Sequence, residues 1–277
     1  MFRQSRPSAL WLEELNARAL PSVSSAFADG VLSIRGSDRN DTVVVTVEDD
    51  TITVQADGET ETFDITDAEP LESVDVRLRG GNDTLTLDLG DVSDDLTVEV
   101  AGGAGNDKLT VTAGDVAAGA TVDLILGAGA GNDTIDIDIG AIAADATVNL
   151  DVGAGEGNDD VSVDVESVAG TLTADVRLGA GNDELTWTVG DVEDGATVDV
   201  TVRGGDGKDD VVVDLGAIAD ADVTLDVFLG DGKDELTLIS DADVGADADV
   251  TVTVDTGEGK DTVNTDDLSE DIDADVD

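Results

Sequence analysis

The chain has 277 residues, of which 40% are hydrophobic, so it is long enough and apolar enough to bury a core. It carries 66 acidic residues against 13 basic ones, a formal charge of −53, which repels nucleic acids and anionic membranes and attracts cations. It contains no Cys and no His, which excludes disulfides, thiol nucleophiles and the usual zinc sites, and no run of apolar residues is long enough to predict a membrane-spanning helix.

Residues 1–29 are expected to be a leader or a flexible N-terminal segment. Glu13, Glu14 and Arg18 interrupt the apolar run, so the segment is not an ordinary secretory signal peptide. The pattern LE-x-L-x-x-R-x-L-P-S at 12–22 resembles the leader of many exported planctomycete proteins. The resemblance implies an extracellular or cell-surface location, and a short amphipathic helix is the alternative interpretation.

Residues 30–78 are predicted to form an N-terminal β cap. They contain a degenerate copy of the repeat described below, followed by two alternating runs, 51–55 and 60–65. Asp57-Gly58 joins these runs, which is typical of a β-hairpin turn. Because an uncovered coil would expose a bare strand edge, we expect this hairpin to close the N-terminal end of the fold.

Residues 79–265 contain eight glycine-rich stretches, such as RGGNDTLTL at 79–87 and GGAGNDKLTV at 102–111. Each stretch closes with an aspartate, and these aspartates recur every 24 to 27 residues, a period typical of a solenoid. The eight closing aspartates are Asp83, Asp107, Asp133, Asp159, Asp183, Asp209, Asp234 and Asp261.

Each period predicts two strands and two bends. After Asp133, apolar residues alternate over 135–139, a turn follows with one apolar residue, and a second alternation covers 148–152. The sequence therefore predicts an all-β fold, a parallel β-solenoid of the β-roll kind with about eight coils of 24–27 residues and an N-terminal β-hairpin cap. Trp187 falls at an inward position and is predicted to fill the core, whereas Phe228 is predicted to face outward.

Residues 266–277 are expected to be an acidic C-terminal tail without hydrophobic cover. An end protected only by charge would allow regular coils to associate head to tail, so assembly into fibres or a matrix is also expected.

The glycines predict a cation site. Glycine permits tight bends and leaves backbone carbonyls unshielded, so stacked loops could surround a hard cation such as Ca²⁺ with carbonyl and carboxylate oxygens. GGAGNDKL at 102–109 resembles the calcium-binding nonapeptide G-G-x-G-x-D-x-U-x of repeats-in-toxin (RTX) proteins. The resemblance implies up to about seven calcium ions between neighbouring loops, held by the eight closing aspartates. It also implies the backbone oxygens of Gly103, Gly105, Gly129, Gly131, Gly155, Gly157, Gly179 and Gly181 as ligands.

Two features depart from that family. Its members commonly place two nonapeptides in each coil, whereas this chain has one, so calcium is expected along one edge only. Lys208, Lys233 and Lys260 replace the asparagine that precedes the aspartate in the first five loops, and we expect weaker or no calcium binding there. The alternative is that the aspartates only close turns by accepting backbone N–H groups.

The outward-facing acids form a further column, which is predicted to be solvated surface and comprises Asp88, Asp138, Asp164 and Asp214.

The expected function is that of a secreted or cell-surface calcium-binding structural or adhesive solenoid that folds on calcium binding, and not that of an enzyme. One alternative is a solenoid that binds or cleaves polysaccharide, although the chain has two Trp, four Phe and no Tyr to line a sugar cleft. Another is a calcium-independent acidic surface protein of a halophile.

Overall fold

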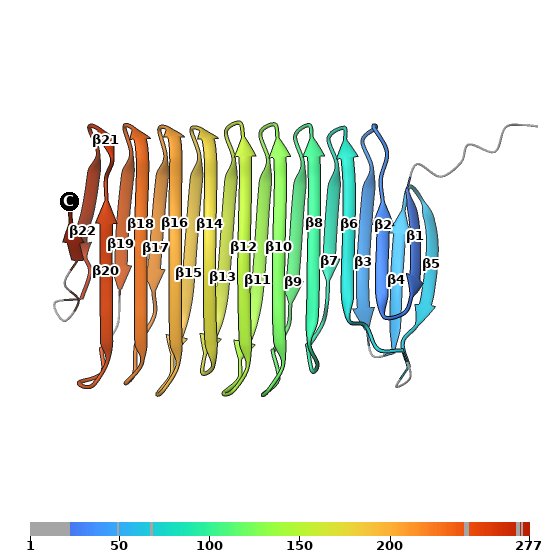
Figure 1. Cartoon of the computed structure of the whole chain (residues 1–277), viewed down its shortest axis with the longest axis horizontal. Helices are drawn as coiled ribbons and strands as arrows, with labels where there is room; N and C mark the ends of the chain where they lie inside the picture. Colours follow the sequence, from blue (N-terminus) through green and yellow to red (C-terminus); the bar gives the residue numbers. More distant parts are fainter. Residues whose placement is uncertain (1–22, 49, 67–68, 241–243, 270–271, 273) are drawn as a thin grey trace, which may run out of the picture.

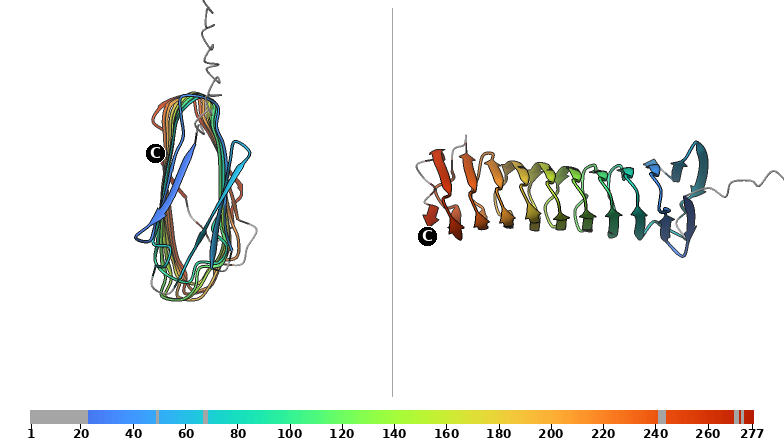
Figure 2. Two further views of the ribbon diagram at one scale, coloured as in Figure 1. Left: turned by 90° about the vertical axis from the view of Figure 1, so that its right-hand side faces the viewer. Right: turned by 90° about the horizontal axis from the view of Figure 1, so that it is seen from above.

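The computed structural model describes residues 23–277 except 49, 67–68, 241–243, 270–271 and 273. These residues form strands, turns and bends, and the strands build two long sheets that face each other across a narrow interior (Figures 1 and 2). The predicted all-β fold is confirmed. Among the described residues, no helix is long and apolar enough to cross a membrane.

The first sheet has twelve strands. They are β1 (Ser24–Ala28), β2 (Val31–Arg35), β6 (Ser73–Gly80), β8 (Leu96–Ala104), β10 (Thr121–Ala130), β12 (Thr147–Glu156), β14 (Thr171–Gly181), β16 (Thr197–Gly207), β18 (Asp222–Gly232), β20 (Asp249–Asp255), β21 (Glu258–Gly259) and β23 (Ala274–Val276).

The second sheet has eleven strands. They are β3 (Thr42–Glu48), β4 (Thr51–Ala56), β5 (Glu59–Asp64), β7 (Thr84–Asp88), β9 (Lys108–Ala113), β11 (Thr134–Ile142), β13 (Asp160–Val168), β15 (Glu184–Val192), β17 (Asp210–Leu215), β19 (Glu235–Ser240) and β22 (Thr262–Asp267).

Successive coils stack in parallel and in register, which confirms the predicted solenoid. Each coil gives one strand to each sheet, so that β10 lies between β8 and β12 while β11 lies between β9 and β13. The stack makes about eight turns. At about 4.8 Å per coil, these turns extend about 40 Å along the axis.

The core consists of inward columns of apolar side chains. Val111, Ile137, Val163, Trp187 and Val213 follow one another in register on five neighbouring strands of the second sheet. All five are buried, and Trp187 has no exposed surface, which confirms its predicted place in the core. Burial of each aliphatic side chain contributes about 1.5–3 kcal/mol, and only the neighbouring coils make that burial complete.

The N-terminal end is closed by antiparallel strands. β4 and β5 form the predicted hairpin, with Asp57 and Gly58 at φ 51° and 82° as a tight hairpin turn requires. β1 pairs antiparallel with β2 at the end of the other sheet. The two sheets meet where the rings of Phe27 and Phe63 lie 6.3 Å apart and the Ser25 hydroxyl donates to the Glu61 carboxylate.

The boundaries of the cap differ from the prediction. β1 falls within the predicted leader, so residues 24–28 are part of the fold. β2 and β3 already stack in parallel on β6 and β7, so the antiparallel cap comprises only β1, β4 and β5. The remainder of the predicted leader, residues 1–22, lies outside the described residues.

The C-terminal end also differs from the prediction. β22 extends to Asp267, and β23 pairs with β20, so the predicted tail adds a strand to the first sheet. Ile272 is buried, and Leu268 packs against the core. Leu268 and Ile272 thus give this end apolar contacts that the prediction did not include.

Candidate functional site

The glycine-rich stretches lie where a first-sheet strand turns into a second-sheet strand, and they form the upper edge of the molecule in Figure 1, here called the glycine-loop edge. The loop between β8 and β9 is typical. β8 runs through Gly102 and Gly103 to Ala104, so the glycines are part of the strand ladder, and Asp107 comes directly before β9.

Close packing between loops explains the glycines. Gly129 and Gly131 have φ values of 120° and 144°, a backbone conformation that side chains rarely permit. A Cβ atom on Gly129 would lie 2.0 Å from the carbonyl oxygen of Gly103, and one on Gly131 would lie 1.9 Å from that of Gly105. Each loop therefore rests its carbonyls against the α-carbons of the next loop.

This packing fixes the carbonyl oxygens that were predicted as ligands. The carbonyl oxygens of Gly103 and Gly105 lie where Cβ atoms on Gly129 and Gly131 would be. The loops are also linked by hydrogen bonds, since the N–H of Gly105 donates to the Ala130 carbonyl at 2.8 Å. The same contact recurs from Gly131 to Glu156 at 2.8 Å.

The closing aspartates form a buried hydrogen-bonded ladder. The Oδ1 atom of each accepts the backbone N–H of the aspartate one coil earlier, over distances of 2.7–3.0 Å. The side chains from Asp83 to Asp234 are at most 3% exposed, and that of Asp261 is half-buried. These aspartates thus accept backbone N–H groups, as the alternative interpretation expects, but the donors belong to the neighbouring coil and not to the same turn.

Asp41 begins this ladder, although it is not among the eight aspartates predicted as ligands. It is 1% exposed, and its N–H donates to Asp83. Its Oδ2 atom accepts the N–H of Ser37 at 2.6 Å. The signal was the Asn-Asp pair at 40–41, which the degenerate loop SDRND shares with the five later loops.

The second carboxylate oxygen, Oδ2, accepts a hydrogen bond in Asp41 but not in the aspartates of the later loops. It is buried without a hydrogen-bond partner in seven residues: Asp83, Asp107, Asp133, Asp159, Asp183, Asp209 and Asp234. A buried acceptor without a partner is costly, and an ionised one more so. A proton or a cation would stabilise each of these seven oxygen atoms.

The pKa values of these carboxyl groups reflect that cost. Burial raises the pKa of Asp107 from 3.8 to about 6, against the lowering effect of its hydrogen bond from the Asp83 backbone, and the charges of Asp83 and Asp133 raise it further. Burial likewise raises the pKa of Asp159 and of Asp209 to about 6. The pKa values rise mainly because burial disfavours the charged form, and the neighbouring carboxylates, which repeat from coil to coil, add to the increase.

A calcium site at this edge would have to take most of its ligands from the backbone. Calcium takes six to eight oxygen ligands at about 2.3–2.6 Å. Within the described residues, no group of three or more Asp or Glu side chains converges closely enough to hold a metal ion. Each coil offers one unpaired carboxylate oxygen, and the loop carbonyls pack against the next loop. The predicted calcium sites therefore remain a prediction.

A second ladder, of asparagines, lies on the outside of the glycine-loop edge. From Asn40 to Asn182, each side-chain oxygen accepts the backbone N–H of the corresponding residue one coil later, at 2.8–3.1 Å. The ladder ends when Asn182 accepts the N–H of Lys208. The next such N–H, of Lys233, donates to the Gly207 carbonyl at 3.3 Å instead. The sequence showed the change from Asn to Lys, but not that it ends a ladder.

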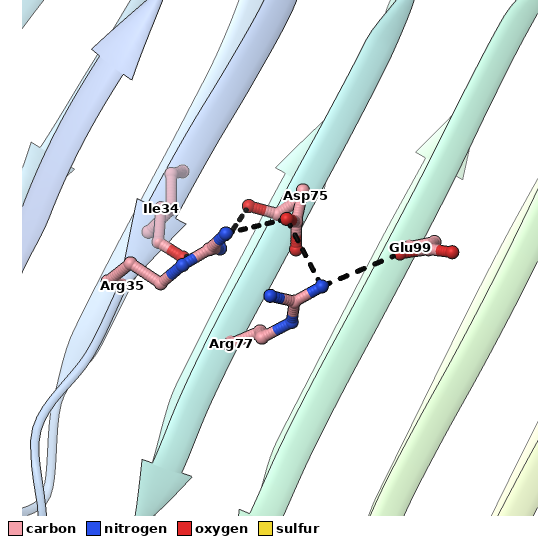
Figure 3. Close-up of polar contacts among 5 residues, drawn as sticks. All are labelled: Ile34, Arg35, Asp75, Arg77 and Glu99. Carbon is pink, nitrogen blue, oxygen red and sulfur yellow. Dashed lines mark hydrogen bonds and ion pairs between the residues drawn. The ribbon is translucent and has the colours of Figure 1, made fainter.

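The outer face of the first sheet carries ion pairs. Arg35 contacts Asp75 at 2.6 Å, and Arg77 lies 3.3 Å from Asp75 and 3.9 Å from Glu99 (Figure 3).

Five coils further along the same face than Arg77, Arg203 pairs with Asp175 at 2.6 Å and lies 5.5 Å from the ring centre of Phe228. Phe228 is 39% exposed, as its predicted outward position requires.

The predicted column of outward acids lies on the second sheet. Asp88, Asp138 and Asp164 are exposed, and Asp214 is half-buried. Partial burial, with the charges of Asp136 and Asp164, raises the pKa of Asp138.

Comparison with protein-family models, with curated proteins and with solved structures finds no match to this chain. The resemblance to RTX repeats and to planctomycete leaders therefore depends on the motifs alone.

Proposed function

We propose that this protein is a secreted or cell-surface structural solenoid, a rod that acts as a spacer or an adhesive element and not as a catalyst. The observation that carries the proposal is the uninterrupted register of the coils from β6 to β20. Each coil repeats the same loop and the same inward columns, which suits a scaffold better than a reaction site, where side chains of different kinds must converge.

The location of the protein tests this proposal. Cells that carry the intact gene product are fractionated, and the surface is treated with protease before the protein is detected. We expect the protein in the medium or in the protease-sensitive surface fraction. Recovery only from the protease-protected cytoplasm would contradict the proposal.

Calcium-linked folding remains part of the proposal because of seven buried carboxylate oxygens without partners and a formal charge of −53. A cation that binds only the folded chain stabilises it in proportion to the logarithm of its concentration. The alternative is a coil that folds without calcium.

A calcium titration decides between these views. Chelator-treated protein is followed by circular dichroism at constant ionic strength, with magnesium as the control. A transition from coil to β structure specific to calcium would support calcium-linked folding. A chain that is already folded and indifferent to both ions would leave an acidic rod that needs salt only for screening.

End-to-end assembly is weakened as a proposal by the covered ends. Phe27 and Phe63 close one end, and Leu268 and Ile272 cover the other. Sedimentation velocity over a range of protein and salt concentrations tests it, and a single species at all concentrations would exclude fibres.

A further inference from the structure

A groove of about 1010 Å³ lies on the edge opposite the glycine loops. It forms where the chain between β5 and β6 passes the bend that joins β7 to β8 (Figure 1). Hydrogen bonds hold the passing segment in place, with the N–H of Ile65 donating to Asp50 at 2.7 Å and that of Glu72 donating to Gly30 at 2.8 Å. The groove arises because this connection belongs to the cap and follows a different path from the later bends.

The groove combines an apolar floor with an acidic rim. Val47, Ile65 and Leu71 line it and are half-buried, so part of their apolar surface faces the groove. Six carboxylates line it, and no Lys or Arg does; the carboxylates are Asp50, Glu72, Asp91, Asp94, Asp95 and Asp123. Among the described residues, none of these six makes an ion pair. Such a surface suits a segment that is both cationic and apolar.

The chain contains one such segment, at its N-terminus. Residues 1–12, MFRQSRPSALWL, include two arginines, five large apolar side chains and no acid, in a chain with 66 acids and 13 bases. They lie outside the described residues. We propose that residues 1–12 bind in this groove, with the arginines against its rim and Phe2 and Trp11 against its floor.

The intervening chain is long enough. β1 runs antiparallel to β2 and so passes from the glycine-loop edge toward the edge that holds the groove. To bring residues 1–12 to the groove, residues 13–22 have to span at least the length of β1. Ten residues extend up to about 33 Å, and the five residues of β1 cover about 17 Å. The segment thus reaches the groove of its own molecule, where its effective concentration is high.

Tryptophan fluorescence tests the contact. The chain has two tryptophans, and Trp187 is fully buried, so the emission of the wild type minus that of Trp11→Ala reports Trp11 alone. We expect blue-shifted emission that is protected from acrylamide. The variant Asp91→Asn/Asp94→Asn/Asp95→Asn should shift this emission to that of an indole in water and abolish the protection.

The control variant, Asp191→Asn/Glu193→Gln/Asp194→Asn, removes the same charge from the corresponding bend four coils away. It should leave the emission of Trp11 and its protection from acrylamide unchanged. Arg3→Gln/Arg6→Gln leaves the described fold untouched and should expose Trp11 as the groove variant does. A water-exposed Trp11 in the wild type would overturn the proposal. So would equal protection of Trp11 in the wild type and in the groove and arginine variants.

Discussion

Replacing Asp159 with asparagine tests whether the buried aspartates of the glycine-loop edge are charged. Asp159 is 3% exposed, and its Oδ1 atom accepts the N–H of Asp133 at 2.8 Å. Its Oδ2 atom has no partner. Burial, opposed by the hydrogen bond from Asp133 and reinforced by the charges of Asp183 and Asp133, raises its pKa from 3.8 to about 6. Asparagine keeps the accepting oxygen and removes the charge.

The expected effect changes sign with pH. A pKa raised by about 2 units means that ionisation costs the folded state about 3 kcal/mol at most, at 1.36 kcal/mol per unit. This cost is present above about pH 6 and absent below 3.8, because the folded chain holds the proton more tightly. The amide group of asparagine adds a buried donor without a partner, at about 1 kcal/mol. We expect the variant to be more stable by about 2 kcal/mol near pH 8 and less stable by about 1 kcal/mol near pH 4.

Urea unfolding in the presence of chelator, followed by circular dichroism at both pH values, measures these differences. Asp164→Asn is the matched control, because Asp164 is exposed and lies on β13, the strand that Asp159 directly precedes. A variant that loses the same stability at both pH values would refute the reasoning, since Asp159 would then act through a contact and not through its charge. Added calcium that stabilises only the wild type would identify a cation as the partner of Oδ2.

The remaining predictions concern the same edge. The wild type should lose stability as pH rises from about 4 to 7, because the folded pKa values of Asp107, Asp159 and Asp209 are all raised; pH-dependent urea midpoints check this. Gly131→Ala should lower the free energy of unfolding by about 3 kcal/mol, because a Cβ atom there would clash with Gly105 and because φ is positive. Gly119→Ala has open space around it and should lower this free energy by about 1 kcal/mol. Thermal unfolding compares the two variants. Asn132→Ala removes one hydrogen bond of the asparagine ladder and should lower the free energy of unfolding by about 1 kcal/mol, which thermal unfolding measures.

The solenoid could be predicted because its signals are local and repeated. Alternation of apolar residues fixes which side of each strand faces inward, and one glycine-aspartate stretch per period fixes where the chain turns. Eight copies of one pattern leave little freedom in register, as the column from Val111 to Val213 shows.

The ends could not be predicted as well, because they do not repeat. β1 lies in a stretch without a strong alternating pattern, and it is ordered by its pairing with β2 and by the contact between Phe27 and Phe63. The C-terminal cover depends on Ile272, one apolar residue among acids, whose burial only the three-dimensional path of the chain reveals.

At the candidate site, the sequence predicted the residues but not their partners. Asp107 as a calcium ligand and Asp107 as an acceptor of a backbone N–H require the same Gly-rich stretch and the same spacing. Which oxygen accepts a backbone N–H and which has no partner depends on the rise from one coil to the next, a property of the stack and not of any single loop. The same is true of the asparagine ladder that ends at Lys208.

The two ladders give the rod a direction. Up to the coil of Lys208, an aspartate and an asparagine side chain both accept a backbone N–H from a neighbouring loop. Beyond it, within the described residues, only the aspartate side chain does so. The cap at the N-terminal end joins both sheets, whereas near the C-terminal end the pairing of β19 with β22 has a register shift between Thr237 and Ile239. In a stack where each coil contacts only its neighbours, stability is a sum of such contacts, so opening begins where they are fewest. The C-terminal coils should therefore exchange their amide hydrogens first, and the coils between β6 and β15 last.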